Sequence, residues 1–301
     1  MQKIVPHLWF DTQAVEAAEF YASVFPDSKV AHTSVIHDTP SGDCDIVSFT
    51  VWGTEFQAIS AGPYFKLNPA ISFMVNFDPS REKDAAEKID EVWKKLEDGG
   101  SALMPIGEYP FSRRYGWIQD KYGVSWQLIL TDPEGEERPA IVPSLLFVKD
   151  VCGQAGPAIE HYTKIFEDSK VGMQAPYGKN EMGEREDHLM FADFKLCNQW
   201  FAAMDSGQDH AFAFNEAISF IVNCDNQEEI DRYWSALSAV AESEQCGWLK
   251  DKFGVSWQIV PSAMATMMES DNEDAKKRVT EAFLKMKKFD IAALEKAFSG
   301  E

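Results

Sequence analysis

The sequence has few cysteines and few basic residues, and both shortages exclude classes of protein. The five cysteines are odd in number and show no CxxC spacing, so we expect reduced thiols rather than a disulfide framework. Lysine and arginine number 28 against 49 acidic residues, which gives a net charge of −21. Such a charge repels phosphate backbones and anionic membranes. We therefore expect neither nucleic acid nor a membrane as a partner.

Long apolar runs are missing as well. No stretch approaches the roughly 20 apolar residues that a membrane-spanning helix needs, and the start at Met1 to Ile4 shows no signal-peptide organisation. The 45% of hydrophobic and 13% of aromatic residues are typical of a globular protein. These features predict a cytoplasmic protein. Its 301 residues suit two domains of about 130 to 145 residues each.

What the sequence does contain is a repeat. Residues 116–127 (GWIQDKYGVSWQ) and residues 247–258 (GWLKDKFGVSWQ) are almost identical. Shorter matches run in the same order around them, such as AISF at residues 70–73 and again at residues 217–220. A tandem repeat in this order implies that the two halves of the chain fold alike.

Each half alternates strand and helix patterns in the same way. In the first half the patterns predict a strand at 4–10, a helix at 14–25 and strands at 29–36, 45–52 and 56–60. A second unit follows, with a strand at 70–77, a helix that begins at the cap Asp78 and ends at Gly99, and strands at 101–104, 113–119 and 124–130. The whole chain is therefore predicted to hold four βαβββ modules.

The repeat and its proline-rich boundaries divide the chain into parts. The predicted parts are a first domain, a short linker, a second domain and a tail, at residues 1–132, 133–142, 143–262 and 263–301. In the tail, apolar stripes after Asn272 and Asp290 predict two amphipathic helices. We expect these helices either to dock on the domains or to mediate contact in a homodimer.

Three stretches carry a family resemblance: Pro6–Asp11, the helix end at Phe20–Ser28 and the closing motif at Cys246–Pro261. They resemble the PhnB-like branch of the vicinal oxygen chelate superfamily, which includes glyoxalase I, bleomycin and fosfomycin resistance proteins and extradiol dioxygenases. The resemblance covers residues 1–262. It implies an α+β fold of tandem glyoxalase-like domains, each of two βαβββ modules curling round a cavity, with the two domains packed against each other.

The PhnB-like family is often labelled a 3-demethylubiquinone-9 3-methyltransferase. A methyltransferase of the usual doubly wound kind carries a glycine-rich turn between a strand and a helix. This sequence has no such turn, and its pair Gly99-Gly100 follows a helix instead. The residues therefore do not support the chemistry in the label.

The resemblance also implies where a metal would be bound. In metal-dependent members a histidine on the first strand and a glutamate on the last strand of a module hold a divalent ion. The two glutamate positions hold Gln127 and Gln258 here, and an amide is a weaker ligand for such an ion than a carboxylate. The first-strand position falls on Pro6, so His7 is expected on the opposite face unless the strand bulges. We expect no metal or other cofactor, with a divalent ion on His7 as the alternative.

Alternation along the closing strands selects candidate ligand-binding residues. Trp126 is expected under helices, which leaves Ser125 and Gln127 facing the cavity, and the second half repeats this pattern. Arg113, in an extra loop, is suited to contact an anion. His7 and Arg113 together make the first half the better candidate. The predicted site residues are His7, Arg113, Ser125, Gln127, Ser256 and Gln258.

Three functions are compatible with these residues. Amides at the metal positions favour a protein that binds a small neutral or aromatic molecule in a metal-free cavity. The first alternative is an isomerase, lyase or resistance enzyme with a metal on His7 and Gln127. In the second alternative Gln127 and Gln258 satisfy backbone groups in filled cavities, and the chain is a scaffold. The sequence does not identify the ligand, because this fold hosts many chemistries.

Overall fold

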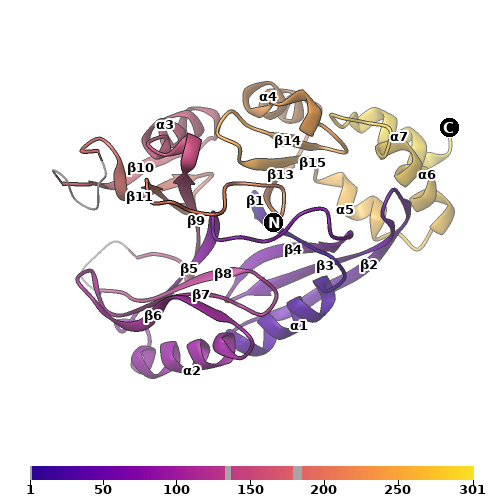
Figure 1. Ribbon diagram of the computed structural model, residues 1–301. Coiled ribbons are helices and arrows are strands. Elements are labelled where there is room, and N and C mark those ends of the chain that lie inside the picture. Colours follow the sequence, from indigo (N-terminus) through magenta and orange to yellow (C-terminus); the bar gives the residue numbers. More distant parts are fainter. Residues whose placement is uncertain (1, 133–136, 179–184) are drawn as a thin grey trace.

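The computed structural model describes residues 2–132, 137–178 and 185–301, and it confirms the predicted α+β fold (Figure 1). The strands are β1 (Ile4–Phe10), β2 (Lys29–Thr39), β3 (Gly42–Val51), β4 (Thr54–Ser60), β5 (Ile71–Phe77), β6 (Ser101–Tyr109), β7 (Ser112–Gln119), β8 (Ser125–Leu130), β9 (Ile141–Val148), β10 (Lys170–Pro176), β11 (Leu189–Leu196), β12 (Gln199–Ser206), β13 (Ile218–Cys224), β14 (Trp248–Lys250) and β15 (Ser256–Pro261). The helices are α1 (Ala14–Val24), α2 (Ala85–Glu97), α3 (Ala155–Ile165), α4 (Gln227–Leu237), α5 (Ala263–Met268), α6 (Glu273–Phe283) and α7 (Ile291–Ser299). Within the described residues no helix is both long and apolar enough to cross a membrane.

Each of the two sheets combines strands from both halves of the chain. Sheet A has seven strands in the order β14-β15-β13-β1-β4-β3-β2, and sheet B has eight in the order β10-β11-β12-β9-β5-β8-β7-β6. The halves meet through antiparallel pairs, β1 with β13 in sheet A and β5 with β9 in sheet B. The first module of one half therefore shares a sheet with the second module of the other half.

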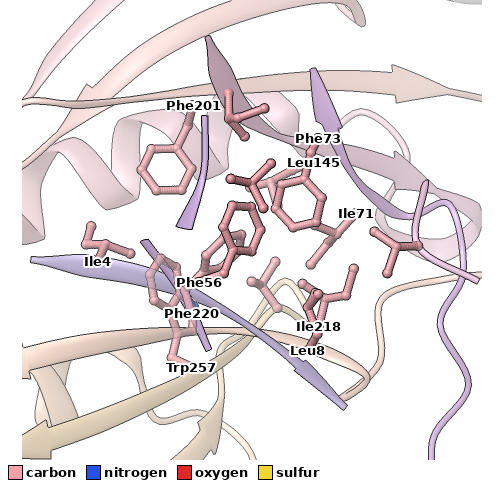
Figure 2. Packing of buried hydrophobic residues seen from close by; sticks show 14 of the residues in the cluster. Ile4, Leu8, Phe56, Ile71, Phe73, Leu145, Phe201, Ile218, Phe220 and Trp257 are labelled. Atoms are coloured by element: carbon pink, nitrogen blue, oxygen red, sulfur yellow. The ribbon is translucent and has the colours of Figure 1, made fainter. Parts of the chain in front are cut away.

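One hydrophobic core connects both sheets with the helices. Leu8 and Phe56 of sheet A converge in it with Phe73 of sheet B (Figure 2). The ring of Trp126 on β8 lies 5.2 Å from the ring of Tyr21 on α1, so this helix ties the two modules of the first half together. Because strand side chains alternate, the residues between these core positions point to the opposite face of each sheet.

The repeated closing motif is held together by a buried aspartate. One oxygen of Asp251 accepts hydrogen bonds from the backbone N–H groups of Phe253 (2.9 Å) and Val255 (3.0 Å), and the other accepts from the indole N–H of Trp257 (2.8 Å). Asp120 makes the equivalent bonds in the first half. Burial raises the pKa of both carboxyl groups, and these hydrogen bonds oppose the rise. This part of the motif is structural, and it fixes the register of the serine and glutamine within the same segment.

Helix α2 begins later than the sequence predicts. The Asp78 carboxylate accepts a hydrogen bond from the N–H of Ser80 (2.8 Å), and its carbonyl accepts from the N–H groups of Arg81 (3.1 Å) and Glu82 (2.9 Å). These bonds close a turn, and the helix starts only at Ala85. The predicted start at Asp78 is therefore wrong, because this aspartate caps a turn instead of a helix.

The fourth module lacks one strand. After α4 a 3-10 turn at Ala241–Ser243 occupies the place where the first half has β6, and β14 follows directly. The prediction of four complete βαβββ modules is wrong for this module, since the connection before β14 is too short for a hairpin. Residues 133–136 of the predicted linker at 133–142 lie outside the described residues.

The tail, residues 263–301, forms three helices beside sheet A, on the right in Figure 1. The predicted cap Asp290 is confirmed, since its side chain accepts a hydrogen bond from the N–H of Ala293 at 3.0 Å. Asn272, where the first stripe begins, also caps its helix and accepts from the N–H of Ala275 at 3.0 Å. Helix α6 is shorter than predicted, and α5 was not predicted.

Candidate functional site

A continuous row of polar side chains crosses sheet A on the face opposite the core residue Leu8. The pairing register aligns one residue from each strand, from β2 to β14: His32, Ser48, Gln57, His7, Ser219, Ser256 and Lys250. Paired residues on neighbouring strands point to the same side of a sheet. These seven residues, which we name the polar row, therefore share one face.

His7 lies at the centre of the polar row. Its side chain is buried, with 3% of the residue exposed, and its Nδ1 atom has no hydrogen-bond partner. Burial lowers the pKa of His7 to about 3, so the imidazole is neutral at neutral pH. The expectation that His7 points away from the cavity face is wrong, because β1 pairs regularly with Gln57 and Ser219 and has no bulge.

Next to His7, the second half of the chain contributes an amide and two hydroxyl groups. The Gln258 side-chain N–H donates to the Ser219 hydroxyl at 2.9 Å, which fixes the orientation of the amide. The hydroxyl of Ser256 is buried and has no partner. Two unpaired polar atoms, on Ser256 and His7, therefore lie on one face. Leaving a buried polar group unpaired costs roughly 1 to 3 kcal/mol, which a ligand can recover.

Two half-buried tryptophans border this part of the face. The Trp248 ring meets the His7 ring edge-on at 5.4 Å, and the Trp9 ring lies 6.1 Å from Trp248. The indole N–H of Trp9 donates to the carbonyl of Gly62 at 2.8 Å, and its ring contacts Phe65 at 5.1 Å. The tryptophans are thus held in place and present aromatic surface beside the unpaired polar atoms.

In sheet B the corresponding glutamine and serine side chains form more hydrogen bonds within the protein. The Gln127 N–H group donates to the Ser72 hydroxyl at 2.8 Å, and the Tyr115 hydroxyl donates to the Gln127 oxygen at 2.7 Å. The indole N–H of Trp117 donates to the Ser125 hydroxyl at 2.7 Å. Both ends of the Gln127 amide are therefore occupied by protein groups.

Apolar side chains fill the same face of sheet B. Met74, Val142, Trp200 and Ala202 form a separate buried cluster there. The Arg138 guanidinium stacks on the Trp200 ring at 3.6 Å from its centroid. The residue that takes the place of His7 is Ser144, whose hydroxyl is buried and unpaired. Sheet B therefore offers one unpaired hydroxyl within an otherwise filled face.

The structure groups the predicted site residues differently from the sequence analysis. His7 lies in sheet A with Ser256 and Gln258 of the other half, whereas Ser125 and Gln127 lie in sheet B. The predicted metal pair of His7 and Gln127 is wrong, because their strands belong to different sheets.

Arg113 is exposed near the start of β7 in sheet B and is not part of the polar row. Its neighbour Arg114 forms an ion pair with Asp90 at 2.6 Å.

Several residues of these faces were missed by sequence analysis. Ser72 and Ser219 stand in the repeated AISF strand, and their shared position was the signal that could have identified them as partners of the glutamines. Gln57 carried no such signal, and the match of Trp248 with Trp117 in the repeat did not indicate a place beside His7. Their place on the His7 face depends on strand pairing between distant segments.

The polar row does not fit the divalent metal site that the superfamily resemblance implies. It offers imidazole, amide, hydroxyl and one ammonium group, and no carboxylate. In residues 2–132, 137–178 and 185–301 no three His, Cys, Asp or Glu side chains are placed to hold a metal ion. Hard divalent cations are bound mainly by carboxylate oxygens.

Comparisons with known proteins agree with the repeat and the fold. The PhnB protein of Bacillus cereus is 38% identical over 43% of this chain and 100% of its own length, with a TM-score of 0.38. Glyoxalase I from Zea mays is 10% identical over 86% of this chain and 94% of its own, with a TM-score of 0.53, which indicates a shared fold. Comparison with curated proteins gave no match.

The family assignment follows from sequence over most of the chain. The family described as 3-demethylubiquinone-9 3-methyltransferase matches residues 2–129 and again residues 139–260. The two matched segments correspond to the two halves of the repeat. The chain therefore belongs to this family, the PhnB-like branch of the vicinal oxygen chelate superfamily, and carries two tandem copies of its domain.

Proposed function

We propose that this chain binds a small uncharged molecule on the polar row of sheet A without the help of a metal. One observation carries the proposal: His7 Nδ1 and the Ser256 hydroxyl are both buried, both unpaired and both on the same face. Polar atoms that are buried without partners are rare in folded proteins, and a bound ligand is one way to satisfy them.

The chemistry of the face supports an uncharged ligand with a ring or another apolar part. The buried members of the row, His7, Ser219 and Ser256, carry no charge, and Gln258 beside them is a neutral amide. A charged ligand would lose its hydration there without gaining an opposite charge. Flat aromatic surface from Trp248 suits a planar group.

Sheet B supports a different role for the second face. Its glutamine is bonded at both ends, and Trp200 with its neighbours fills the space above the strands. The scaffold interpretation therefore applies to sheet B, and binding is proposed for sheet A alone. Methyl transfer is not proposed, because the sequence lacks the glycine-rich turn on which that chemistry is usually built.

A fragment screen tests the proposal. Thermal unfolding is recorded with a panel of uncharged heteroaromatic amides and lactams, for the parent protein, His7→Ala and the matched control Ser144→Ala. A binder present at one hundred times its dissociation constant adds about 2.7 kcal/mol to the free energy of unfolding. We expect at least one fragment to stabilise the parent and Ser144→Ala but not His7→Ala. His7→Gln repeats the test with a side chain of similar size.

Two results would contradict the proposal. A fragment that stabilises His7→Ala as much as the parent does not bind at the polar row. A fragment whose effect disappears in Ser144→Ala, while it persists in His7→Ala, binds at sheet B instead.

A further inference from the structure

The tail contacts both outer strands of sheet A. At one end, the backbone N–H groups of Cys246 and Gly247, directly before β14, donate to the carbonyls of Met286 (2.9 Å) and Lys287 (2.7 Å). At the other end, residues of the α5–α6 segment face β2 across a cavity. Seven strands at about 4.8 Å spacing span about 29 Å, so a segment that reaches both ends must cross the sheet or close it into a ring.

At the β14 end the tail stands where the other sheet has a strand. In sheet B the edge strand β6 pairs with β7, and Gly107 lies opposite Tyr115. Cys246 matches Tyr115 in the repeat, and its N–H donates to the tail residue Met286. Phe289 is buried beside Gly247, where a Cβ atom would lie only 2.5 Å from the phenylalanine ring. The tail thus takes over the edge that the missing strand leaves.

At the β2 end the tail leaves a cavity of about 310 Å³. Its lining comes from β2 and from the α5–α6 segment: His32, Thr33, Ser34, Val35, His37, Met268, Glu269, Ser270, Asp271, Glu273 and Lys276. His32 is the outermost member of the polar row, and Ser34 lies two residues along on the same face. The cavity therefore adjoins the face that carries His7.

We propose that the tail is the outer wall of the His7 face and that the cavity between β2 and the α5–α6 segment is the entrance to it. Figure 1 shows α5 between the part of sheet A formed by β13 to β15 and the part formed by β2 to β4, with α6 and α7 further to the right. The inference rests on the proposed function, in which the polar row binds a ligand, and it adds the route by which that ligand arrives.

The entrance also limits the class of ligand. Glu269, Asp271 and Glu273 line it together with a single lysine, Lys276, which forms an ion pair with Glu273. The chain as a whole carries a net charge of −21. A potential of this sign repels anions. The ligand that passes through is therefore neutral or cationic, in agreement with an uncharged molecule at His7.

Residue-resolved labelling of histidine tests the entrance without any ligand. Diethyl pyrocarbonate, a small neutral reagent, modifies neutral imidazoles, and peptide mass spectrometry at low conversion gives a rate for each histidine. We compare the full-length parent with Ser34→Trp, which fills the cavity, and with Ala175→Trp, which places the same bulk at the repeat-equivalent position on β10. Phe289→Ala loosens the tail at its other end.

If the cavity is the entrance, the labelling rate of His7 should change in opposite directions in Ser34→Trp and Phe289→Ala. His7 labelling should become several-fold slower in Ser34→Trp, stay unchanged in Ala175→Trp and become several-fold faster in Phe289→Ala. The rates of His161 and His210 report whether a variant has unfolded, and they should not change. Absence of His7 labelling in the parent, or equal rates in the two tryptophan variants, would overturn the inference. If His7 labelling changes as predicted in the variants but no fragment binds, the proposed function is rejected and the entrance is still supported.

Discussion

Sheets A and B share the same strand pairings except for the edge strand β6, which only sheet B has. Even so, one face of sheet B is filled by side chains, whereas the matching face of sheet A keeps polar groups without partners. Both keep the pair of serine and glutamine, Ser219 with Gln258 and Ser72 with Gln127. They differ in the strand next to β1 or β9. In sheet A, Gln57 lies beside His7, whereas in sheet B, Ala202 lies beside Ser144. A duplicated fold can therefore use one copy of a face for packing and retain the other for binding.

A second difference concerns the residue directly before the repeated Gly-Trp pair, which is Tyr115 in the first half and Cys246 in the second. In sheet B, Tyr115 donates its hydroxyl to the Gln127 oxygen. Cys246 takes that place in sheet A, where burial raises the pKa of its thiol and the tail covers its backbone. A thiol is a weak hydrogen-bond donor. The glutamine of sheet A is therefore anchored through its N–H group by Ser219 and lacks the tyrosine bond that sheet B has.

The largest expected effect is on packing in sheet B. Trp200→Ala removes a buried ring from the apolar cluster and should lower the free energy of unfolding by about 3 to 5 kcal/mol. The register-equivalent Glu55→Ala in sheet A should cost less than about 1 kcal/mol, since it removes only a bond from the Gln2 N–H. Urea denaturation measures both. Similar losses in the two variants would show that sheet A is filled to the same degree.

The second expected effect is a pH dependence that comes from His7 in sheet A, whose place in sheet B is taken by Ser144. The pKa of His7 is lowered to about 3 in the folded protein by burial and is near 6.5 in the unfolded chain. Between these values the unfolded state binds a proton that the folded state does not, so stability falls as the pH falls below 6.5. The loss is about 1.4 kcal/mol per pH unit, or about 2 kcal/mol at pH 5.

The matched variant for this measurement is His7→Gln. Urea denaturation at pH 7 and pH 5 should give a smaller loss for the variant than for the parent, by about 2 kcal/mol. Other titrating groups are common to both proteins and cancel in the difference. Equal losses in the two proteins would mean that His7 gains a proton in the folded state and is not buried as a neutral imidazole.

The third expected effect tests whether Tyr115 completes the bonding in sheet B. Tyr115→Phe leaves the buried Gln127 oxygen without a partner and should cost about 1 to 2 kcal/mol of stability. The control is Tyr109→Phe, because the Tyr109 hydroxyl donates to the carbonyl of Pro105 in an exposed position. We expect less than about 0.5 kcal/mol for the control. No difference between the two variants would indicate that the Gln127 bond contributes nothing to closing sheet B.

Local features of the fold were predictable because neighbouring residues specify them. Alternation along the closing strand placed Trp126 under the helices and Gln127 on the other face, and the structure has this arrangement. The helix cap Asp290 is also confirmed. The predicted start of α2 is wrong, because Asp78 is followed by residues that suit a turn as well as a helix.

The composition of the site was not predictable from one half of the repeat. His7 meets Gln258 of the other half because β1 pairs with β13, and this pairing joins segments more than 200 residues apart. Nothing in the local sequence specifies such a register. The family comparison by itself also favoured Pro6 over His7 for the cavity face. The tail takes the place of a missing strand beside β14, and the sequence of β14 does not indicate this contact.

The smallest expected effect separates the two faces most directly. Ser256 and Ser144 both carry buried hydroxyls without partners, so replacing either by alanine should change stability by less than about 1 kcal/mol, in the stabilising direction. Binding should distinguish them. Ser256→Ala should weaken a fragment that needs His7 by about three- to tenfold, the value of one hydrogen bond, whereas Ser144→Ala should leave its dissociation constant unchanged. Titration calorimetry with the same fragment measures both. Because the two serines have equal burial, a binding loss confined to Ser256 can only come from what surrounds it: the imidazole of His7, the amide of Gln258 and the tail that walls the face.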